Sequence, residues 1–245
     1  IGDVDLAGPT QAPVARFLQV NQRPVLNDPA QVALTGRDHA AGLFTDIPDL
    51  MVPKTARLAG GDLASAGFSG AVLVRPVGSH GGRGLIRAER TEDAPVLDGP
   101  AYITGFCDFR SDDGAYRKYR IAFVDREPYP YHLAIADHWL VHYENAGMES
   151  DPVRRAEEAA FLADPAAAIG APAMAALVAV GRRLDLDYAG VDFSILPDGR
   201  LLLFEANATM FIHPEAEGGP FAYKNPFVAR ITAAFQAMLE RAART

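Results

Sequence analysis

Apolar and polar residues alternate near the C-terminal end of the chain, and this period of two predicts paired β-strands. Residues 191–196 alternate apolar side chains with Asp192 and Ser194. Turn-forming residues follow at 197–200 and an apolar run at 201–204, so we expect a β-hairpin here. By the same criteria, further strands are expected at 71–75, 85–88, 101–106, 117–124, 129–136 and 139–143.

Helical composition sets three other stretches apart. Residues 151–163 and 171–184 are rich in Ala, Leu, Glu and Arg, and residues 225–243 form an amphipathic helix with Pro226 in its first turn. Runs of strands separated by groups of helices predict an α+β protein of two lobes with a cleft between them.

The domain boundaries follow from this order. Residues 1–30 are rich in Pro, Asn, Asp and Gln, and we interpret them as a remnant of, or linker from, a preceding domain. The small lobe is expected over residues 31–105 and the C-terminal lobe over residues 106–245. No internal repeat interrupts this arrangement.

Composition narrows the function classes. The chain has 245 residues, is 49% hydrophobic and 22% charged, and carries a net charge of -8. We therefore expect no nucleic-acid partner and no membrane partner, because neither a basic field nor a long apolar segment is present. Cys107 is the single cysteine, so an internal disulfide is excluded and a cytoplasmic location is expected. The chain begins at Ile1 without signal-peptide features, and we expect it to be part of something longer.

The C-terminal hairpin offers three oxygen ligands. Glu205 and Asn207 share a face of their strand, and antiparallel pairing brings Asp192 close to them. Two carboxylates and an amide oxygen suit Mg²⁺ or Mn²⁺. The alternative is structural: Asp192 caps a turn and Glu205 pairs with an arginine. An acid at the end of the apolar run LLLFE needs a cation opposite it in either case.

A glycine-rich loop at residues 74–84 joins two expected strands, unlike the strand-to-helix phosphate loops of other nucleotide-binding proteins. Its glycines allow the backbone to approach a ligand, and its polar residues add donors. A mobile hairpin connection is the alternative. Arg75 favours phosphate binding, because it places a permanent charge beside the loop. The candidate loop residues are Gly78, Ser79, His80, Gly81 and Gly82.

Other basic residues could serve the same cleft. Arg37 precedes the extended segment VPKT, and strand alternation places Lys118 and Arg120 on one face, with Arg117 and Tyr119 on the other. Basic strand residues are often merely solvated, and what favours a functional role for these is their combination with the three oxygen ligands.

The order of motifs resembles the ATP-grasp superfamily. The chain has NDP-x-x-V and VPKT, then VLVRP with its glycine-rich loop, AYITGF, the hairpin KYRIAFVDREPYP, and finally GVDF with FEAN. This series covers residues 25–240 and is similar to carboxylate-amine ligases related to glutathione synthetase and the ribosomal-protein glutamate ligases.

The resemblance implies a two-lobed ATP-grasp fold that holds a nucleotide between two antiparallel sheets. Arg75 and Arg37 stand where the family usually has phosphate-binding lysines, which keeps the charge and changes its geometry. It further implies that Tyr102, Ile103 and Thr104 line the adenine pocket, that Asp192, Glu205 and Asn207 bind magnesium, and that Arg120 stabilises the transferred phosphoryl group. The family also has an N-terminal domain, and we expect at most the last strand of that domain in this sequence.

The implied reaction joins a carboxylate to an amine. ATP phosphorylates the carboxylate, and an amine attacks the acyl phosphate, with Mg²⁺ or Mn²⁺ as cofactor and Arg75 and Arg120 as catalytic residues. The substrates would be small molecules or peptides, and Lys118, His132 and His213 are candidate contacts to them. A homo-oligomer or a separate N-terminal domain could complete the protein. The alternatives are a phosphotransferase without an amine acceptor and a degenerate nucleotide-binding module with a docking role.

Overall fold

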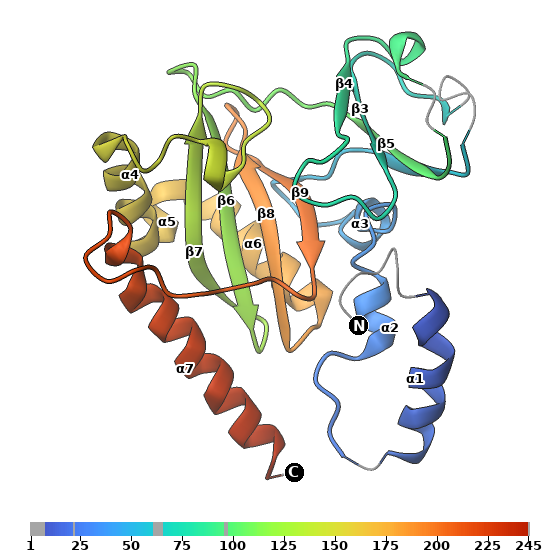
Figure 1. Ribbon diagram of the computed structural model, residues 1–245, viewed down its shortest axis with the longest axis vertical. Helices are drawn as coiled ribbons and strands as arrows, with labels where there is room; N and C mark the ends of the chain where they lie inside the picture. The colour runs from blue at the N-terminus through green and yellow to red at the C-terminus, as the bar shows by residue number, and fades with distance from the viewer. Residues whose placement is uncertain (1–7, 22, 61–65, 96–97, 245) are drawn as a thin grey trace.

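Two β-sheets organise the computed structural model, which describes residues 8–21, 23–60, 66–95 and 98–244 (Figure 1). The larger sheet has the strand order β1-β9-β8-β6-β7 and the smaller has the order β2-β5-β3-β4. The strands of the larger sheet are β1 (Leu50–Met51), β6 (Tyr116–Val124), β7 (Glu127–Ala136), β8 (Tyr188–Ile195) and β9 (Leu201–Asn207). Those of the smaller sheet are β2 (Thr55–Leu58), β3 (Val72–Pro76), β4 (Ile86–Ala88) and β5 (Ala101–Gly105). The expected α+β architecture with two sheets is confirmed.

The helices follow the sequence pattern closely in the C-terminal half. The α-helices are α1 (Gly8–Val20), α2 (Pro29–Ala33), α3 (Ala40–Leu43), α4 (Pro152–Ala163), α5 (Pro165–Ile169), α6 (Ala171–Leu184) and α7 (Asn225–Ala242), and short 3-10 helices are η2 (Thr91–Asp93), η3 (Tyr143–Asn145) and η4 (Ala222–Lys224). Asp151 caps α4 by accepting hydrogen bonds from the backbone of Val153 and Arg154. In the described part of the chain, no helix combines the length and apolar character that spanning a membrane requires.

Two expectations about strands are wrong. The larger sheet is not wholly antiparallel, because β1 pairs in parallel with β9 through Leu50 and Leu201. Residues 139–143 do not form a strand either. The backbone there bends into η3, where the side chain of Asn145 accepts a hydrogen bond from the backbone N–H of His142. A side chain that satisfies the backbone locally replaces the ladder that a strand would need.

The two predicted hairpins of the larger sheet are present. Asp125 and Arg126 both have positive φ, as a tight turn between β6 and β7 requires. Pro128 and Pro130 lie within β7, which is an edge strand of the sheet. An edge strand tolerates proline because one side of it makes no ladder hydrogen bonds.

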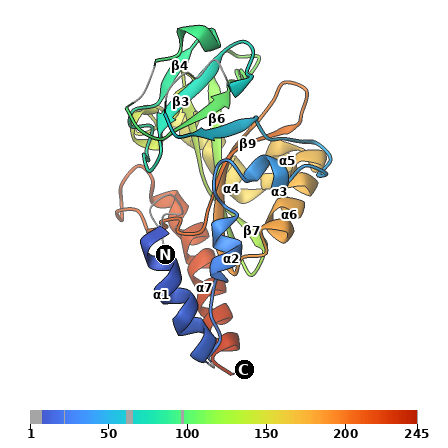
Figure 2. The ribbon, with the colours of Figure 1, turned by 90° about the vertical axis from the view of Figure 1, so that its right-hand side faces the viewer.

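Alternation along β6 divides the larger sheet into two faces. Ile121 and Phe123 join the main core with residues of α4 and α6, while Ala122 and Val124 pack with residues of α7. Figure 2 shows α6 and α7 on opposite faces of the sheet. Lys118 and Arg120 therefore share the α7 face with Ala122, as expected from the sequence. A fully buried aliphatic or aromatic side chain in these cores contributes about 1.5–3 kcal/mol.

The lobes do not divide where the sequence suggested. Val32, Phe44 and Ile47 belong to the main core, and β1 belongs to the larger sheet, so residues 29–51 pack with the larger lobe rather than the small one. The expected linker contains a regular helix, α1. Among the described elements, the chain crosses between the lobes twice, at residues 52–54 and at residues 106–115.

Candidate functional site

A transverse row of charged side chains crosses the larger sheet. Arg120 of β6 lies opposite Asp192 of β8 and also opposite His132 of β7. Asp192 in turn lies opposite Glu205 of β9. Residues directly opposite on antiparallel strands share a face, so these four side chains project from the same side of the sheet.

Asp192 is the most buried carboxylate of the row and has two cationic partners. Its side chain is 3% exposed, and it lies 3.0 Å from Lys118 Nζ and 2.5 Å from Arg120 Nε. Arg120 also donates from Nη2 to the second carboxylate oxygen at 2.8 Å, which makes the pair bidentate. Burial opposes the ionisation of Asp192, but Lys118 and Arg120 outweigh it and hold its pKa well below the usual range.

Glu205 is neutralised from a different part of the chain. Arg37, in the segment between α2 and α3, donates from Nη2 to Glu205 Oε2. Burial and the neighbouring Asp192 both raise the pKa of Glu205, but Arg37 and Lys118 outweigh them and the net shift is downward. Both acids of the row are therefore ionised at neutral pH. Arg37 is therefore the cation that the sequence led us to expect opposite Glu205, the acid at the end of the apolar run LLLFE.

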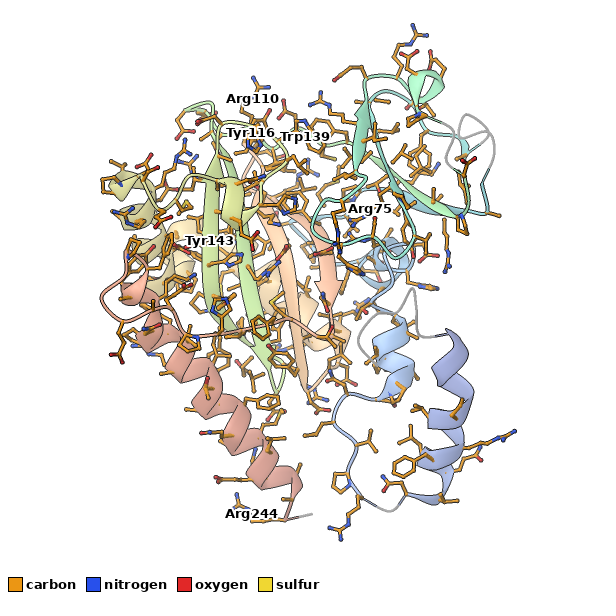
Figure 3. The ribbon with its side chains drawn as sticks, in the orientation of Figure 1. Arg75, Arg110, Tyr116, Trp139, Tyr143 and Arg244 are labelled. Carbon is orange, nitrogen blue, oxygen red and sulfur yellow. The ribbon has the colours of Figure 1, made fainter. Side chains whose placement is uncertain are left out.

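The glycine-rich loop follows β3 and lies beside this row. Arg75, near the end of β3, donates to the side-chain hydroxyl of Ser79 at 3.3 Å and to its carbonyl. These bonds hold the guanidinium against its own loop. In Figure 3, Arg75 lies between the small sheet and β9. Gly81, Gly82 and Arg75 all line the cleft between the lobes.

The cleft has a volume of about 220 Å³ and an excess of positive charge. Its charged lining residues are Arg37, Arg75, Lys118, Arg120, Asp192 and Glu205. Four cations against two carboxylates leave an excess of two positive charges on a chain whose net charge is -8. This local reversal of sign suits a polyanionic ligand such as a nucleotide polyphosphate.

Some predicted site residues lie outside the lining of the cleft. Tyr102 and Ile103 are buried in the small lobe, although Thr104 beside them does reach the cleft. His213 is exposed, and its ring nitrogen Nδ1 lies 3.1 Å from the carbonyl oxygen of Pro214. His132 is buried next to the site. The other predicted residues outside the lining are Gly78, Ser79, His80 and Asn207.

A second buried polar cluster adjoins His132. Its ring stacks on Tyr143 at 4.8 Å between centroids, and burial holds the pKa of His132 well below 6.5. Tyr143 donates to the buried carboxylate of Glu158 at 2.8 Å. Lys224 is 1% exposed, lies 4.3 Å from the Tyr143 ring centroid and pairs with Glu215 at 2.7 Å. These groups tie the segment before α7 to the sheet.

Several residues that line the cleft were not among the site residues expected from the sequence. Trp139 and His142 line it, and Trp139 makes an edge contact with Phe106 at 5.8 Å between ring centroids. The sequence does carry a signal here, a cluster of histidines and aromatic residues at 132–148, but it does not show which members of the cluster face the cleft.

The donor set fits a hard divalent cation. Asp192 and Glu205 are ionised and face each other across two strands, and Asn207 follows Glu205 on the same face. Asn207 Oδ1 accepts hydrogen bonds from Thr209, which fixes the orientation of its amide. Among the described residues, no group of three or more His, Cys, Asp or Glu side chains forms a metal site, so a cation here would depend on Asn207 or on ligand oxygens as well.

No family model and no curated protein matches the chain. Solved structures do match the chain. The ATP-grasp ligase PsnB, with a phosphomimetic variant of its minimal precursor, Mg and ADP, matches 95% of this chain and 68% of its own at 16% identity and a TM-score of 0.50. PsnB with minimal precursor matches 95% and 69% at 14% identity, also with a TM-score of 0.50. A RimK domain protein from Sphaerobacter thermophilus matches 94% and 77% at 19% identity, with a TM-score of 0.49. The chain spans about two thirds of the length of PsnB, and its own fold is the ATP-grasp fold.

Proposed function

We propose that the protein is an ATP-dependent ligase that joins a carboxylate to an amine through an acyl phosphate. The observation that carries this proposal is the facing pair Asp192 and Glu205 within a cleft that has an excess of positive charge. An opposed pair of ionised acids suits a divalent cation, and the surrounding cations suit the phosphates that accompany it.

The residues of the cleft divide the chemistry between them. Asp192, Glu205 and Asn207 would hold Mg²⁺, which supplies charge neutralisation at the phosphates when bound. Arg75 and Arg37 bind phosphate oxygens, and Lys118 and Arg120 stabilise charge on the transferred phosphoryl group. Gly81 and Gly82 cover the cleft and exclude water that would hydrolyse the acyl phosphate. No side-chain nucleophile is needed, so Cys107 serves as a lining residue.

The proposed substrate class includes peptides. PsnB, whose fold this chain shares, was solved with its precursor peptide and with Mg and ADP. A peptide carboxylate is therefore the first substrate class to test here, followed by free amino acids. The adenine ring would lie beside Thr104 and the connection that follows β5, where the cleft lining is mainly apolar.

Calorimetric titration with the non-hydrolysable analogue AMPPNP, with and without Mg²⁺, tests the nucleotide site. We expect Mg²⁺-dependent binding that Glu205→Ala abolishes and that Glu217→Gln, on the exposed loop before η4, leaves unchanged. ADP and phosphate release are then measured with peptide carboxylates and amines. Phosphate release that requires the amine supports the ligase, and a stable phosphorylated product without amine supports the phosphotransferase. No nucleotide binding in any condition contradicts both.

A further inference from the structure

His142 carries an unsatisfied polar atom at the cleft. Among the described residues, two buried side-chain nitrogens lack a hydrogen-bond partner, Arg87 Nε and His142 Nε2. The guanidinium of Arg87 stacks over the Phe106 ring at 3.9 Å, which accounts for its position. His142 lines the cleft instead. A buried nitrogen without a partner is costly, so a group that enters the cleft and pairs with it gains affinity.

The unsatisfied nitrogen lies against the glycine-rich loop of the other lobe. A Cβ atom placed on Gly82 would lie 2.3 Å from His142 Nε2, so only glycine permits this approach. Gly82 also has φ +68, which favours glycine independently. His142 therefore faces the same loop whose backbone is proposed to cover the nucleotide phosphates. It approaches that loop from the larger lobe.

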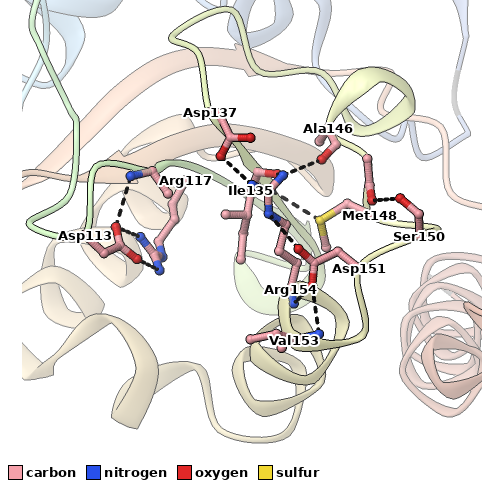
Figure 4. Close-up of polar contacts among 12 residues, drawn as sticks. Asp113, Arg117, Ile135, Asp137, Ala146, Met148, Ser150, Asp151, Val153 and Arg154 are labelled. Carbon is pink, nitrogen blue, oxygen red and sulfur yellow. Dashed lines mark hydrogen bonds and ion pairs between the residues drawn. The ribbon is translucent and has the colours of Figure 1, made fainter.

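The segment that carries His142 is firmly attached to the larger lobe. Arg154 of α4 donates to the carbonyl of Ile135 at 3.0 Å and to that of Ala146 at 2.9 Å, and it pairs with Asp137 and Asp151 (Figure 4). These contacts link α4, the end of β7 and both ends of residues 137–151. The imidazole is thus presented from an anchored segment, which lowers the entropic cost of using it to bind a ligand.

The surroundings of His142 favour an anionic partner for a neutral imidazole. Burial lowers the pKa of His142, and the nearby charge of Lys118 lowers it further. A neutral imidazole has one N–H donor, and its tautomer follows the partner it meets. The cations that line the same cleft attract phosphate rather than another positive group.

We propose that His142 is a phosphate-binding residue supplied by the larger lobe, whose Nε2–H donates to a phosphate oxygen of the nucleotide beside Gly82. This inference rests on the proposed function and adds a contact to the same cleft. It gives the glycine-rich loop a partner across the cleft, so that nucleotide phosphate bound beside Gly82 and the imidazole contacts both lobes.

The test uses calorimetric titration with AMPPNP and with adenosine, both with Mg²⁺, on the whole chain. His142→Leu removes the donor and should weaken AMPPNP binding about 10- to 100-fold while leaving adenosine binding unchanged. His142→Gln, whose amide nitrogen can replace Nε2, should recover most of the affinity. His138→Leu is the matched control, because His138 is exposed on the same segment and lies outside the cleft lining.

Thermal unfolding of the ligand-free variants separates binding from structure. His142→Leu replaces an unsatisfied buried nitrogen with apolar atoms, so its unfolding temperature should not fall. Equal AMPPNP affinity of His142→Leu and the wild type overturns the inference while leaving the proposed function intact. An equal loss of affinity for AMPPNP and adenosine in His142→Leu also overturns the inference. So does a loss of AMPPNP affinity that accompanies a lower unfolding temperature and is not recovered by His142→Gln. Failure of the wild type to bind AMPPNP at all overturns the proposed function and this inference with it.

Discussion

Asp192 and Glu205 lie directly opposite each other on β8 and β9, and each carboxylate is neutralised by cations from a different part of the chain. Two facing carboxylates repel each other and would raise one another's pKa without such partners. Arg37 reaches Glu205 from before α3, while Lys118 and Arg120 reach Asp192 from β6. The site is therefore assembled from four separate stretches of sequence.

Replacing Arg75 tests whether charge or geometry matters at the glycine-rich loop. We expect Arg75→Gln to weaken AMPPNP binding more than 10-fold, by roughly 1.4 kcal/mol or more, because a charge-assisted contact is lost. Arg75→Lys keeps the charge but loses the hydrogen bond from Nε to Ser79, so its AMPPNP affinity should fall less than that of Arg75→Gln. Titration at two salt concentrations checks both variants. Equal losses of AMPPNP affinity in the two variants would mean that the planar arrangement of donors on the guanidinium, rather than its charge, is what binds the ligand.

Gly82 and Gly81 form a matched pair for testing the approach of the loop to His142. Both have positive φ, so alanine at either position costs roughly 1–2 kcal/mol of backbone strain. A Cβ on Gly82 meets His142, whereas nothing lies within 4 Å of a Cβ on Gly81. We expect Gly82→Ala to weaken AMPPNP binding about 10-fold more than Gly81→Ala.

The double variant with His142→Ala sharpens this comparison. Removing the imidazole also removes the clash, so in the His142→Ala background Gly82→Ala should weaken AMPPNP binding no more than Gly81→Ala does. If the losses of AMPPNP affinity from Gly82→Ala and His142→Ala are strictly additive in the double variant, Gly82 and His142 do not meet in the ligand-bound protein.

Removing the buried lysine should destabilise the fold. Lys224→Met leaves Glu215 without its ion pair and takes a cation away from the neighbourhood of Glu158, so we expect a loss of about 3 kcal/mol in the free energy of unfolding. Urea denaturation followed by far-ultraviolet circular dichroism measures this. Arg241→Ala is the control, because it removes an exposed ion pair with Asp125 and should change stability little. A Lys224→Met protein as stable as the wild type would show that the cluster tolerates an apolar replacement.

The stability of the protein should depend on pH through His132. Burial holds its folded pKa well below 6.5, whereas the unfolded chain binds the proton near pH 6.5. The stabilisation is therefore fully present above pH 6.5 and is lost as pH falls below that value. We expect the wild type to lose about 1.4 kcal/mol per pH unit below about pH 6 relative to His132→Gln. Denaturation curves of both proteins between pH 5 and 8 check this, and parallel curves would contradict it.

The sequence correctly predicted those features of the fold that depend on the periodicity of neighbouring residues. Alternation along β6 correctly placed Lys118 and Arg120 on one face, and helix composition correctly located α4, α6 and α7. The parallel pairing of β1 was not predictable in this way, because a strand of two residues has no period. The contact between Gly82 and His142 joins two lobes, and no spacing along the sequence encodes it. The strand expected at 139–143 failed because Asn145 satisfies the backbone locally.

The two crossings between the lobes, at residues 52–54 and 106–115, limit how the cleft can open. A body attached at two points rotates about the line that joins them. Such a rotation would separate Gly82 from His142 while leaving Leu50 paired with Leu201 and Thr55 paired with Thr104. Ligand exchange would then break no strand pairing, so the same molecule could admit a bulky ligand and release it again with both of its sheets intact.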